Sequence, residues 1–322
     1  MIPVALPSVE ALLLLAFLLI TTLVWIVWTL SLLVRYVAGR WKRPMILPYG
    51  LVTAVALFTL CRFGDFYLQM RAYDKERAAS HRPELLESTR LGQIDMPKGT
   101  KLELAIANNR EAFDRAVFPH PVRVADIDAV EITRYISIKT NENYETVGFT
   151  PQTMRITGNG VTIQNGWRCD ATQPVEFDLS PDGGKSAFSN CTLSDGNVVD
   201  GITLPKGTSL RASTGNVYTD GFVDSDRWVL DTAQDQTVHI DSFDLSEATL
   251  ALDGERKLHE IKRGVLSKDA TLGTLHHAAG INIRYNPRHL RKDYPGAWLI
   301  IAAPSHEIVQ GRDGTVLSSP AD

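Results

Sequence analysis

Two things are scarce in this chain: cysteine, which occurs 3 times in 322 residues, and charge near the N-terminus. Residues 11–34 hold no ionisable side chain across 24 positions, and a helix of that length, about 36 Å, can cross a bilayer. A cleaved signal peptide is the weaker alternative, because no basic segment precedes the stretch, the apolar run is too long and no small-residue cleavage site follows cleanly. We therefore expect a first membrane span here.

A second apolar run covers residues 46–60 and continues to residue 66 if two flanking charges sit at the membrane surface. Its length is borderline, so a buried core helix is the alternative. The sequence predicts a transmembrane helical hairpin over residues 1–70, with spans at about 11–34 and 46–66, and the lipid bilayer as its partner.

The loop between the two spans carries Arg35, Arg40, Lys42 and Arg43 and no acidic residue. Short basic loops of this kind stay on the cytoplasmic side of a membrane. The N-terminus and everything after the second span are then expected on the opposite side. In a bacterium this is the periplasmic side of the inner membrane.

Beyond the hairpin we expect a helical stalk over residues 71–90 and a β-rich periplasmic domain over residues 91–322, in which a division into two sub-units near 150–165 is left open. Residues 1–90 hold 10 of the 33 Lys and Arg and 6 of the 37 Asp and Glu, which leaves 23 basic and 31 acidic residues for the domain. The domain is therefore acidic, and no basic stripe interrupts it. This argues against nucleic acid as a partner.

Short β-branched and alternating runs fill the domain, and in one of them Val130, Ile132, Ile136 and Ile138 would share one face of a strand. Asn-Gly and Asp-Gly pairs, which tolerate the positive φ of tight hairpins, separate several of these runs. These pairs are at residues 159–160, 182–183, 253–254 and 313–314. We therefore expect an all-β, mostly antiparallel domain built of hairpins.

One phrase recurs along the chain, as LGQIDMPKGTKL at 91–102, VDGITLPKGTSL at 199–210 and, more loosely, LGTLHHAAGINI at 272–283. A phosphate-binding loop is excluded because the G-x-x-x-x-G-K-[ST] spacing is absent and no helix follows. The phrase instead predicts turns within repeated, unevenly spaced hairpin units, with proline at the second position of a type I turn and a left-handed glycine completing a bulged hairpin. The residues expected in these turns are Pro97, Gly99, Pro205, Gly207 and Gly280.

Two of the three cysteines, Cys169 and Cys191, form an even pair in the β domain, whereas Cys61 belongs to the second span. A disulfide between the pair suits an exported domain, and closing a loop of that size is worth about 3 kcal/mol. Two buried free thiols are an equally open alternative. No C-x-x-C or H-x-x-x-H spacing accompanies the cysteines, so the sequence predicts no metal site and no cofactor.

No catalytic constellation stands out in the sequence. Ser305, His306 and Glu307 are adjacent along the chain, but adjacency is not the geometry of a catalytic triad, and no nucleophile elbow is recognisable. An enzymatic role is therefore left undecided, with no catalytic residue expected. Three tryptophans are candidates for contact with a protein partner or a sugar, namely Trp167, Trp228 and Trp298.

Together these features favour a membrane-anchored, non-catalytic binding or scaffold protein whose periplasmic domain recognises a protein partner, because the turns and edges of a hairpin-rich sheet suit protein recognition. An accessory subunit of an envelope complex or an immunity-type protein would fit. Two alternatives stay open: a protein that binds or hydrolyses cell-envelope polysaccharide, and a structural subunit of a larger membrane assembly.

Overall fold

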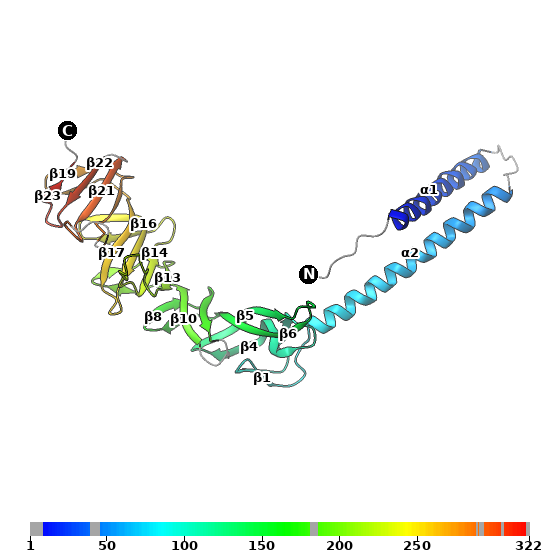
Figure 1. Ribbon diagram of the computed structural model, residues 1–322, viewed down its shortest axis with the longest axis horizontal. Helices are drawn as coiled ribbons and strands as arrows, with labels where there is room; N and C mark the ends of the chain where they lie inside the picture. Colours follow the sequence, from blue (N-terminus) through cyan, green and yellow to red (C-terminus); the bar gives the residue numbers. More distant parts are fainter. Residues whose placement is uncertain are drawn as a thin grey trace. The chain divides into compact units, whose positions relative to one another are not determined.

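The computed structural model describes residues 9–38, 46–180, 186–287, 289, 293–303 and 306–319. The chain separates into two compact units, residues 1–79 and residues 80–322. The first unit is helical, and the second is built around a large sheet (Figure 1). Every strand pair among the described residues is antiparallel. Two N-terminal helices followed by an antiparallel β domain are thereby confirmed.

The two helices are α1 (Val9–Val37) and α2 (Ile46–His81). Each contains a segment that is long and apolar enough to cross a membrane, and almost none of the residues in those segments are buried by protein. The helices meet through polar side chains: Trp25 Nε1 donates to Thr53 Oγ1 at 3.0 Å, and the hydroxyls of Thr29 and Tyr49 lie 3.1 Å apart. Hydrogen bonds of this kind stabilise helix pairs in lipid by about 1 kcal/mol each.

Helix α2 continues without interruption through residues 67–81, beyond residue 66 where the second span is expected to end. The segment after the helix already belongs to the β domain, where Leu102 N donates to Pro83 O and Leu85 is buried, before the first strand begins at Thr89. The helical stalk expected over residues 71–90 is therefore helical only to His81. The basic loop residues Arg40, Lys42 and Arg43 lie outside the described residues. The orientation of the hairpin in a membrane therefore stays a prediction from the sequence.

Fifteen strands form the main sheet of the β domain. In chain order they are β3 (Lys101–Leu104), β4 (Phe113–Val124), β5 (Ile127–Thr140), β6 (Thr146–Gly158), β9 (Val175–Leu179), β10 (Ser186–Thr192), β13 (Ser209–Ala212), β14 (Trp228–Asp231), β15 (Thr237–Ile240), β16 (Phe243–Leu252), β17 (Leu258–Leu266), β20 (Asn282–Tyr285), β21 (Trp298–Ala303), β22 (His306–Gln310) and β23 (Val316–Ser318).

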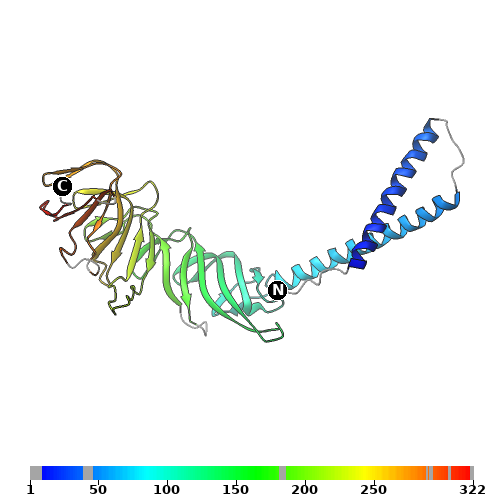
Figure 2. The same ribbon diagram turned by 45° about the horizontal axis from the view of Figure 1, so that its top comes forward.

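Spatial order in the main sheet follows chain order from β3 to β23, except that β15 pairs only with β16 while β14 also pairs with β16. Figure 2 shows the strands of the domain side by side. The expected division near residues 150–165 would fall in and after β6, which is paired on both sides, with β5 and with β9.

Four separate two-stranded hairpins accompany the main sheet: β1 (Thr89–Leu91) with β2 (Ile94–Met96), β7 (Val161–Gln164) with β8 (Trp167–Asp170), β11 (Val198–Val199) with β12 (Ile202–Thr203), and β18 (Ala270–Leu272) with β19 (Leu275–His277). A short 3-10 helix, η1 (Arg110–Ala112), precedes β4. The hairpins contribute Ile94, Trp167, Val199 and Leu272 to the same buried apolar cluster as the main sheet. They cover the face of the sheet whose side chains form this cluster, which we call the inner face. A second, smaller cluster of Ala297, Leu299 and Val309 lies near the C-terminal strands.

Apolar side chains at alternate positions along the strands form the inner face. Leu102, Ala116, Ile132, Ile156 and Val175 lie opposite one another on β3, β4, β5, β6 and β9, and all five are buried. Removing such side chains from water stabilises the fold by about 25 cal/mol per Å² of apolar area. The apolar row explains why the hairpins pack on this side.

Polar side chains occupy the opposite, outer face in the same register. Glu103, Arg115, Thr133, Arg155 and Glu176 follow one another directly across the same five strands. Arg155 Nε donates to Glu176 Oε2 at 3.0 Å. Opposite charges paired across strands contribute up to about 1 kcal/mol each, and a face of this composition is compatible with water.

The copy of the recurring phrase around Pro205 forms a tight turn. Thr208 N donates to Pro205 O at 3.3 Å, and Gly207 at the third position has a φ of +87°. Gly207 N also donates to Leu193 O at 2.9 Å, while Leu193 N donates to Thr208 O at 2.8 Å. The turn is thereby fixed to a buried leucine that directly follows β10.

The other two copies repeat the bond from glycine to a buried leucine, since Gly99 N donates to Leu85 O and Gly280 N to Leu266 O, each at 2.8 Å. In the two proline-containing copies proline is first and glycine third, as in a type II turn, so the expected type I turn with proline second is wrong. The strands that flank each turn do not pair with each other. The turn therefore leads from a small hairpin into the main sheet and does not close a bulged hairpin.

Two of the four hairpins expected from Asn-Gly and Asp-Gly pairs are present. Residues 253–254 join the paired strands β16 and β17, and residues 313–314 join β22 and β23. Residues 159–160 lie between β6 and β7, which do not pair with each other, and residues 182–183 lie outside the described residues.

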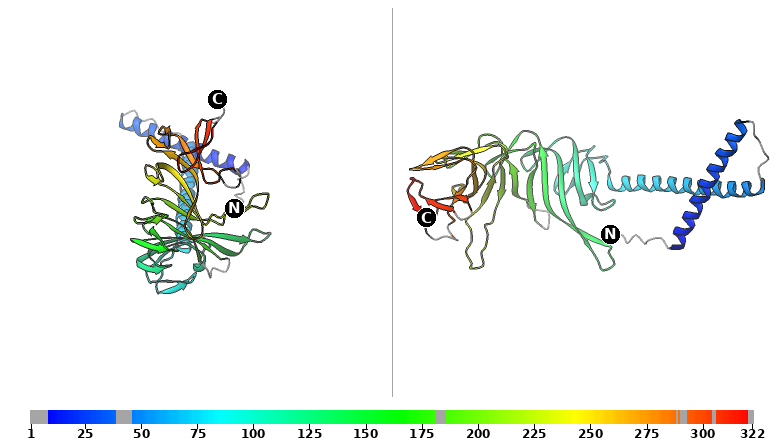
Figure 3. Two further views of the ribbon diagram at one scale, coloured as in Figure 1. Left: turned by 90° about the vertical axis from the view of Figure 1, so that its left-hand side faces the viewer. Right: turned by 90° about the horizontal axis from the view of Figure 1, so that it is seen from above.

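Within the described part of the chain, two-residue turns close six hairpins, at residues 92–93, 125–126, 165–166, 200–201, 241–242 and 273–274. In the first four both residues have positive φ, as type I′ turns require. The turn of Ala125 and Asp126 contains no glycine or asparagine, so its sequence does not predict a turn with positive φ at both residues. Longer connections also occur: Figure 3 shows the end of the β5–β6 hairpin extending beyond the neighbouring strands.

Candidate functional site

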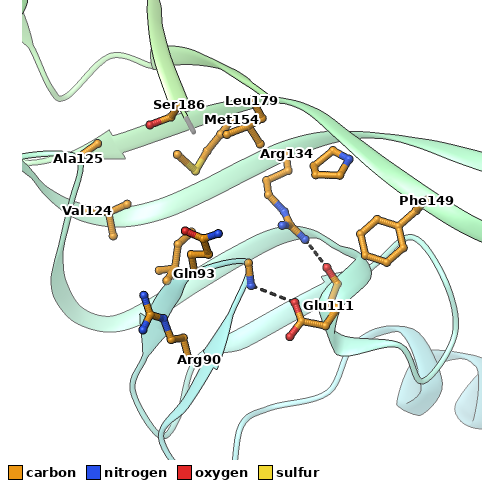
Figure 4. A pocket seen from close by; sticks show the side chains of 13 residues that line it. Arg90, Gln93, Glu111, Val124, Ala125, Arg134, Phe149, Met154, Leu179 and Ser186 are labelled. Atoms are coloured by element: carbon orange, nitrogen blue, oxygen red, sulfur yellow. Dashed lines mark hydrogen bonds between the residues drawn. The ribbon is translucent and has the colours of Figure 1, made fainter. Parts of the chain in front are cut away.

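A cavity of about 620 Å³ lies on the inner face of the β domain, next to the hairpin β1–β2. Its walls come from segments that are far apart in the sequence: this hairpin, η1, the β4–β5 turn, strands β5 and β6, and the adjacent ends of β9 and β10 (Figure 4). Ligand-binding cavities in proteins have volumes in this range. The cavity is therefore the candidate functional site.

Arg134 on β5 is the buried charge of this cavity, with 6% of its surface exposed. Its Nε and Nη2 donate to Phe113 O at 3.0 and 2.9 Å, and Nη2 also donates to Glu111 O at 2.5 Å. The guanidinium carbon lies 3.4 Å from the centroid of the Phe113 ring. Burial lowers the pKa of Arg134 to about 10, against the opposing effect of the nearby Glu111 and Asp114 carboxylates, so the group is charged at neutral pH.

Within the described part of the chain, every recorded hydrogen bond of Arg134 goes to a backbone carbonyl oxygen, so no carboxylate neutralises it by direct contact. These bonds use Nε and Nη2. The third nitrogen, Nη1, lies beside Gly92, where a Cβ atom would be 2.5 Å from it. Only glycine at position 92 allows the guanidinium to pack so closely. A buried charge without a counter-ion is one that an anionic ligand would stabilise.

Two further charged residues line the cavity. Glu111 Oε2 accepts a hydrogen bond from Gly92 N at 3.0 Å and so connects η1 to the β1–β2 turn. Arg90 is exposed, and its Nε lies 3.8 Å from Asp95 Oδ1. The two arginines and one glutamate give the lining a formal charge of +1. Figure 4 shows the side chain of Gln93 between Arg90 and Arg134, where its amide adds neutral hydrogen-bonding groups.

Apolar side chains complete the lining of the cavity. They are Ile94, Val124, Ala125, Phe149, Pro151, Met154 and Leu179. Met154 is buried in the core, whereas Phe149 is half-buried on the part of β6 that extends toward the end of its hairpin. An anionic group with an apolar substituent fits both parts of this lining.

The three tryptophans expected to contact a partner or a sugar do not lie in the cavity. Trp167 and Trp298 are 1% and 0% exposed, so they pack in the core and offer no surface to a ligand. Trp228 is half-buried, and its ring centroid lies 5.8 Å from that of Trp167. The expectation of an exposed stacking platform at Trp167 or Trp298 is therefore wrong, because tryptophan is as effective in filling a core as in binding a ligand.

Cys169 on β8 and Cys191 on β10 are joined by a disulfide with an S–S distance of 2.04 Å. The bridge connects the hairpin β7–β8 to the main sheet beneath it. Cys61 is exposed and is not in a disulfide. Since both bridged sulfurs are in the core, the disulfide has a structural role and contributes no reactive group to the cavity.

A second polar cluster surrounds Asp226, which is 1% exposed. Its Oδ1 lies 2.8 Å from His259 Nε2 and its Oδ2 lies 2.5 Å from Lys262 Nζ. Ser225 Oγ is 3.5 Å from the same Nε2. In a catalytic triad the carboxylate and the hydroxyl bind different nitrogens of the imidazole, so these residues are not arranged as a triad. No cluster of His, Cys, Asp or Glu able to hold a metal ion occurs among the described residues.

The sequence contained a signal for Arg134 that hydrophobic patterning obscured. Arg134 has the same parity as Val130, Ile132, Ile136 and Ile138, so it interrupts an apolar strand face with a charge. In the structure, bulges before Glu131 and after Tyr135 shift that face, and Ile132 and Arg134 are buried while Ile138 is exposed. A charge in an apolar row is the signal to look for, but the walls of the cavity come from strand pairing.

Comparison of the chain with protein-family models, with curated proteins and with solved structures finds no match. The functional argument therefore depends on the geometry of the cavity and on the chain's own sequence.

Proposed function

We propose that this chain is a membrane-anchored, non-catalytic binding protein whose β domain receives a protein partner at the Arg134 cavity, on the periplasmic side of a bacterial inner membrane. The observation that carries the proposal is the buried guanidinium of Arg134, which lines the cavity without a carboxylate partner among the described residues. An accessory subunit of an envelope complex, or an immunity-type protein, would use such a domain.

Both helices support a membrane anchor. Their apolar segments expose large side chains such as Phe17, Ile20, Leu51 and Phe58, which would contact lipid in a bilayer. The basic loop between the helices supports the cytoplasmic placement of that loop, and the disulfide of the β domain suits an oxidising compartment such as the periplasm.

A protein partner is favoured by the surface that continues from the cavity. Phe149 in the lining belongs to the β5–β6 hairpin, which also exposes Ile138, Tyr144 and Val147. Tyr144 and Val147 are 83% and 64% exposed. Exposed aromatic and aliphatic residues next to a cavity are typical of protein interfaces. Polysaccharide binding has less support, because Trp167 and Trp298 lie in the core.

We also propose that the β domain is built from repeated hairpin units. The support is the same glycine-to-leucine bond in all three copies of the phrase and the intervals of 32 to 41 residues between successive two-residue turns. Repetition of this kind produces an extended sheet in which each unit contacts its neighbours.

Site-specific photo-cross-linking in intact cells tests the binding role. Ser186 lines the cavity at the start of β10, while the exposed Ala187 beside it points to the opposite face. A photoreactive amino acid at position 186 is expected to give one discrete protein adduct that the same amino acid at position 187 does not give. Identical adducts at both positions, or none at 186, would contradict the proposal.

A further inference from the structure

We propose that the cavity binds the C-terminal carboxylate of a protein chain whose last residue is apolar, with Arg134 as the anion contact. This inference deepens the proposed function and rests on it, since it names the part of the partner that enters the cavity. Three properties of the lining carry it: an arginine whose Nη1 has no hydrogen bond among the described residues, a formal charge of +1, and an apolar floor.

The first property is the position of Arg134. Two backbone carbonyls and the ring of Phe113 hold the guanidinium in place, so little side-chain entropy is lost when it binds an anion. Nη1 packs against Gly92, where a Cβ atom would be only 2.5 Å from it, so glycine is what allows the guanidinium to take this position. Arg134 lines the cavity, and a carboxylate oxygen that reached Nη1 from the cavity would accept a charge-assisted hydrogen bond, which is about twice as strong as a neutral one.

The second property selects the charge of the ligand. Arg90 and Arg134 supply two positive charges and Glu111 one negative charge. A carboxylate, with one negative charge, neutralises the remaining +1. A phosphate monoester approaches two negative charges at neutral pH, and the second would be repelled by the Glu111 carboxylate. The lining therefore favours a carboxylate over a phosphate.

The third property distinguishes a chain terminus from an acidic side chain. Ile94, Met154 and Leu179 lie in the same cavity as the guanidinium, so the bound anion must be attached to an apolar group. At a C-terminus ending in an apolar residue, the carboxylate and the last side chain leave the same Cα atom. The carboxylate of an internal Asp or Glu brings no apolar group with it and leaves the floor of the cavity in contact with water.

The test uses the full chain in an uncharged detergent and three acetylated tetrapeptide probes, with binding measured by NMR titration of the peptide. The first ends in leucine with a free carboxylate, the second is its C-terminal amide, and the third is an amide with an internal glutamate. The first is expected to bind at least tenfold more tightly than the other two. Equal binding of the acid and its amide, tighter binding of the internal glutamate, or no binding of the acid would overturn the inference.

Two variants locate the binding. Arg134→Met removes the charge at similar length and is expected to reduce affinity for the acid to that of the amide. Ser186→Trp fills the cavity without changing Arg134 and is expected to abolish binding, whereas the matched Ala187→Trp, on the outer face, should bind as the unmodified chain does. If Arg134→Met fails to fold, the Ser186 and Ala187 pair still decides, because equal binding by these two variants would place the peptide elsewhere.

The inference and the proposed function fail in different ways. If the acid and amide peptides bind equally and both lose binding in the Ser186→Trp variant, the role of the carboxylate is refuted and the cavity remains a binding site. Absence of a discrete photo-adduct at position 186 would instead refute the binding role itself.

Discussion

Removing the Cys169–Cys191 disulfide is expected to lower the free energy of unfolding of the β domain by about 3 kcal/mol. The bridge spans a sequence separation of 22 residues, and in the chain-entropy model a closed loop of that size restricts the unfolded chain by this amount. The value is a large part of the 5 to 15 kcal/mol, roughly, that stabilises a typical protein. The bridge also attaches the hairpin β7–β8 to the main sheet, so its loss acts where two layers of the domain meet.

The measurement compares the unmodified chain with a variant carrying Cys169→Ala and Cys191→Ala, unfolded in urea and followed by the far-UV circular dichroism of the sheet. The midpoint is expected to fall while the dependence on urea stays similar. Cys61→Ala is the matched control, because Cys61 is exposed and unbridged, and it should change the free energy by less than about 0.5 kcal/mol.

Counting thiols gives an independent check on the same bridge. The chain has three cysteines, so rapid alkylation of cells followed by denaturation should label one sulfur, that of Cys61, and prior reduction should expose all three. Three labelled thiols without reduction, or an unchanged midpoint in the double alanine variant, would refute the reasoning and would also remove one support for a periplasmic domain.

Three further predictions concern stability. Gly207→Ala should destabilise the domain by about 1 to 2 kcal/mol in urea unfolding, because the residue has a φ of +87°. Gly148→Ala is the control and should not destabilise it, because Gly148 has no positive φ and an added Cβ would meet no atom within 4 Å. Equal effects would contradict the turn assignment. Asp226→Asn should cost about 2 kcal/mol by the same assay, because it leaves Lys262 without its buried counter-ion. Burial lowers the pKa of Lys262, but the hydrogen bond and charge of Asp226, with the charge of Glu260, outweigh burial and raise this pKa above its ordinary value of 10.5. The stabilisation by the Asp226–Lys262 pair should therefore be complete below about pH 10.5 and be lost as the pH rises through the higher pKa of the folded state. A loss that begins at lower pH would show that another group titrates. Arg115→Gln should cost less than about 1 kcal/mol, since its ion pair with Glu131 is exposed; a double-mutant cycle giving more would mean that the outer face is less hydrated than the structure indicates.

Local patterns predicted those features that depend on a few neighbouring residues. The uncharged run at 11–34 and the apolar run from residue 46 coincide with parts of α1 and α2. Alternating β-branched runs separated by Gly and Asn predicted an antiparallel sheet. The glycines of the recurring phrase have the positive φ that the sequence predicts, because a left-handed conformation is a property of one residue and its immediate neighbours.

Features set by strand pairing could not be predicted in this way. Proline is first in a turn that leads from a small hairpin into the main sheet, and Trp167 and Trp298 are buried where the hairpins pack on the inner face. The cavity arises where segments from residue 90 to residue 186 meet. By itself the sequence determined the helical and β character of the chain. Tertiary structure decided that Arg134 would be buried in this cavity, because the register of antiparallel strands determines which distant side chains share a face.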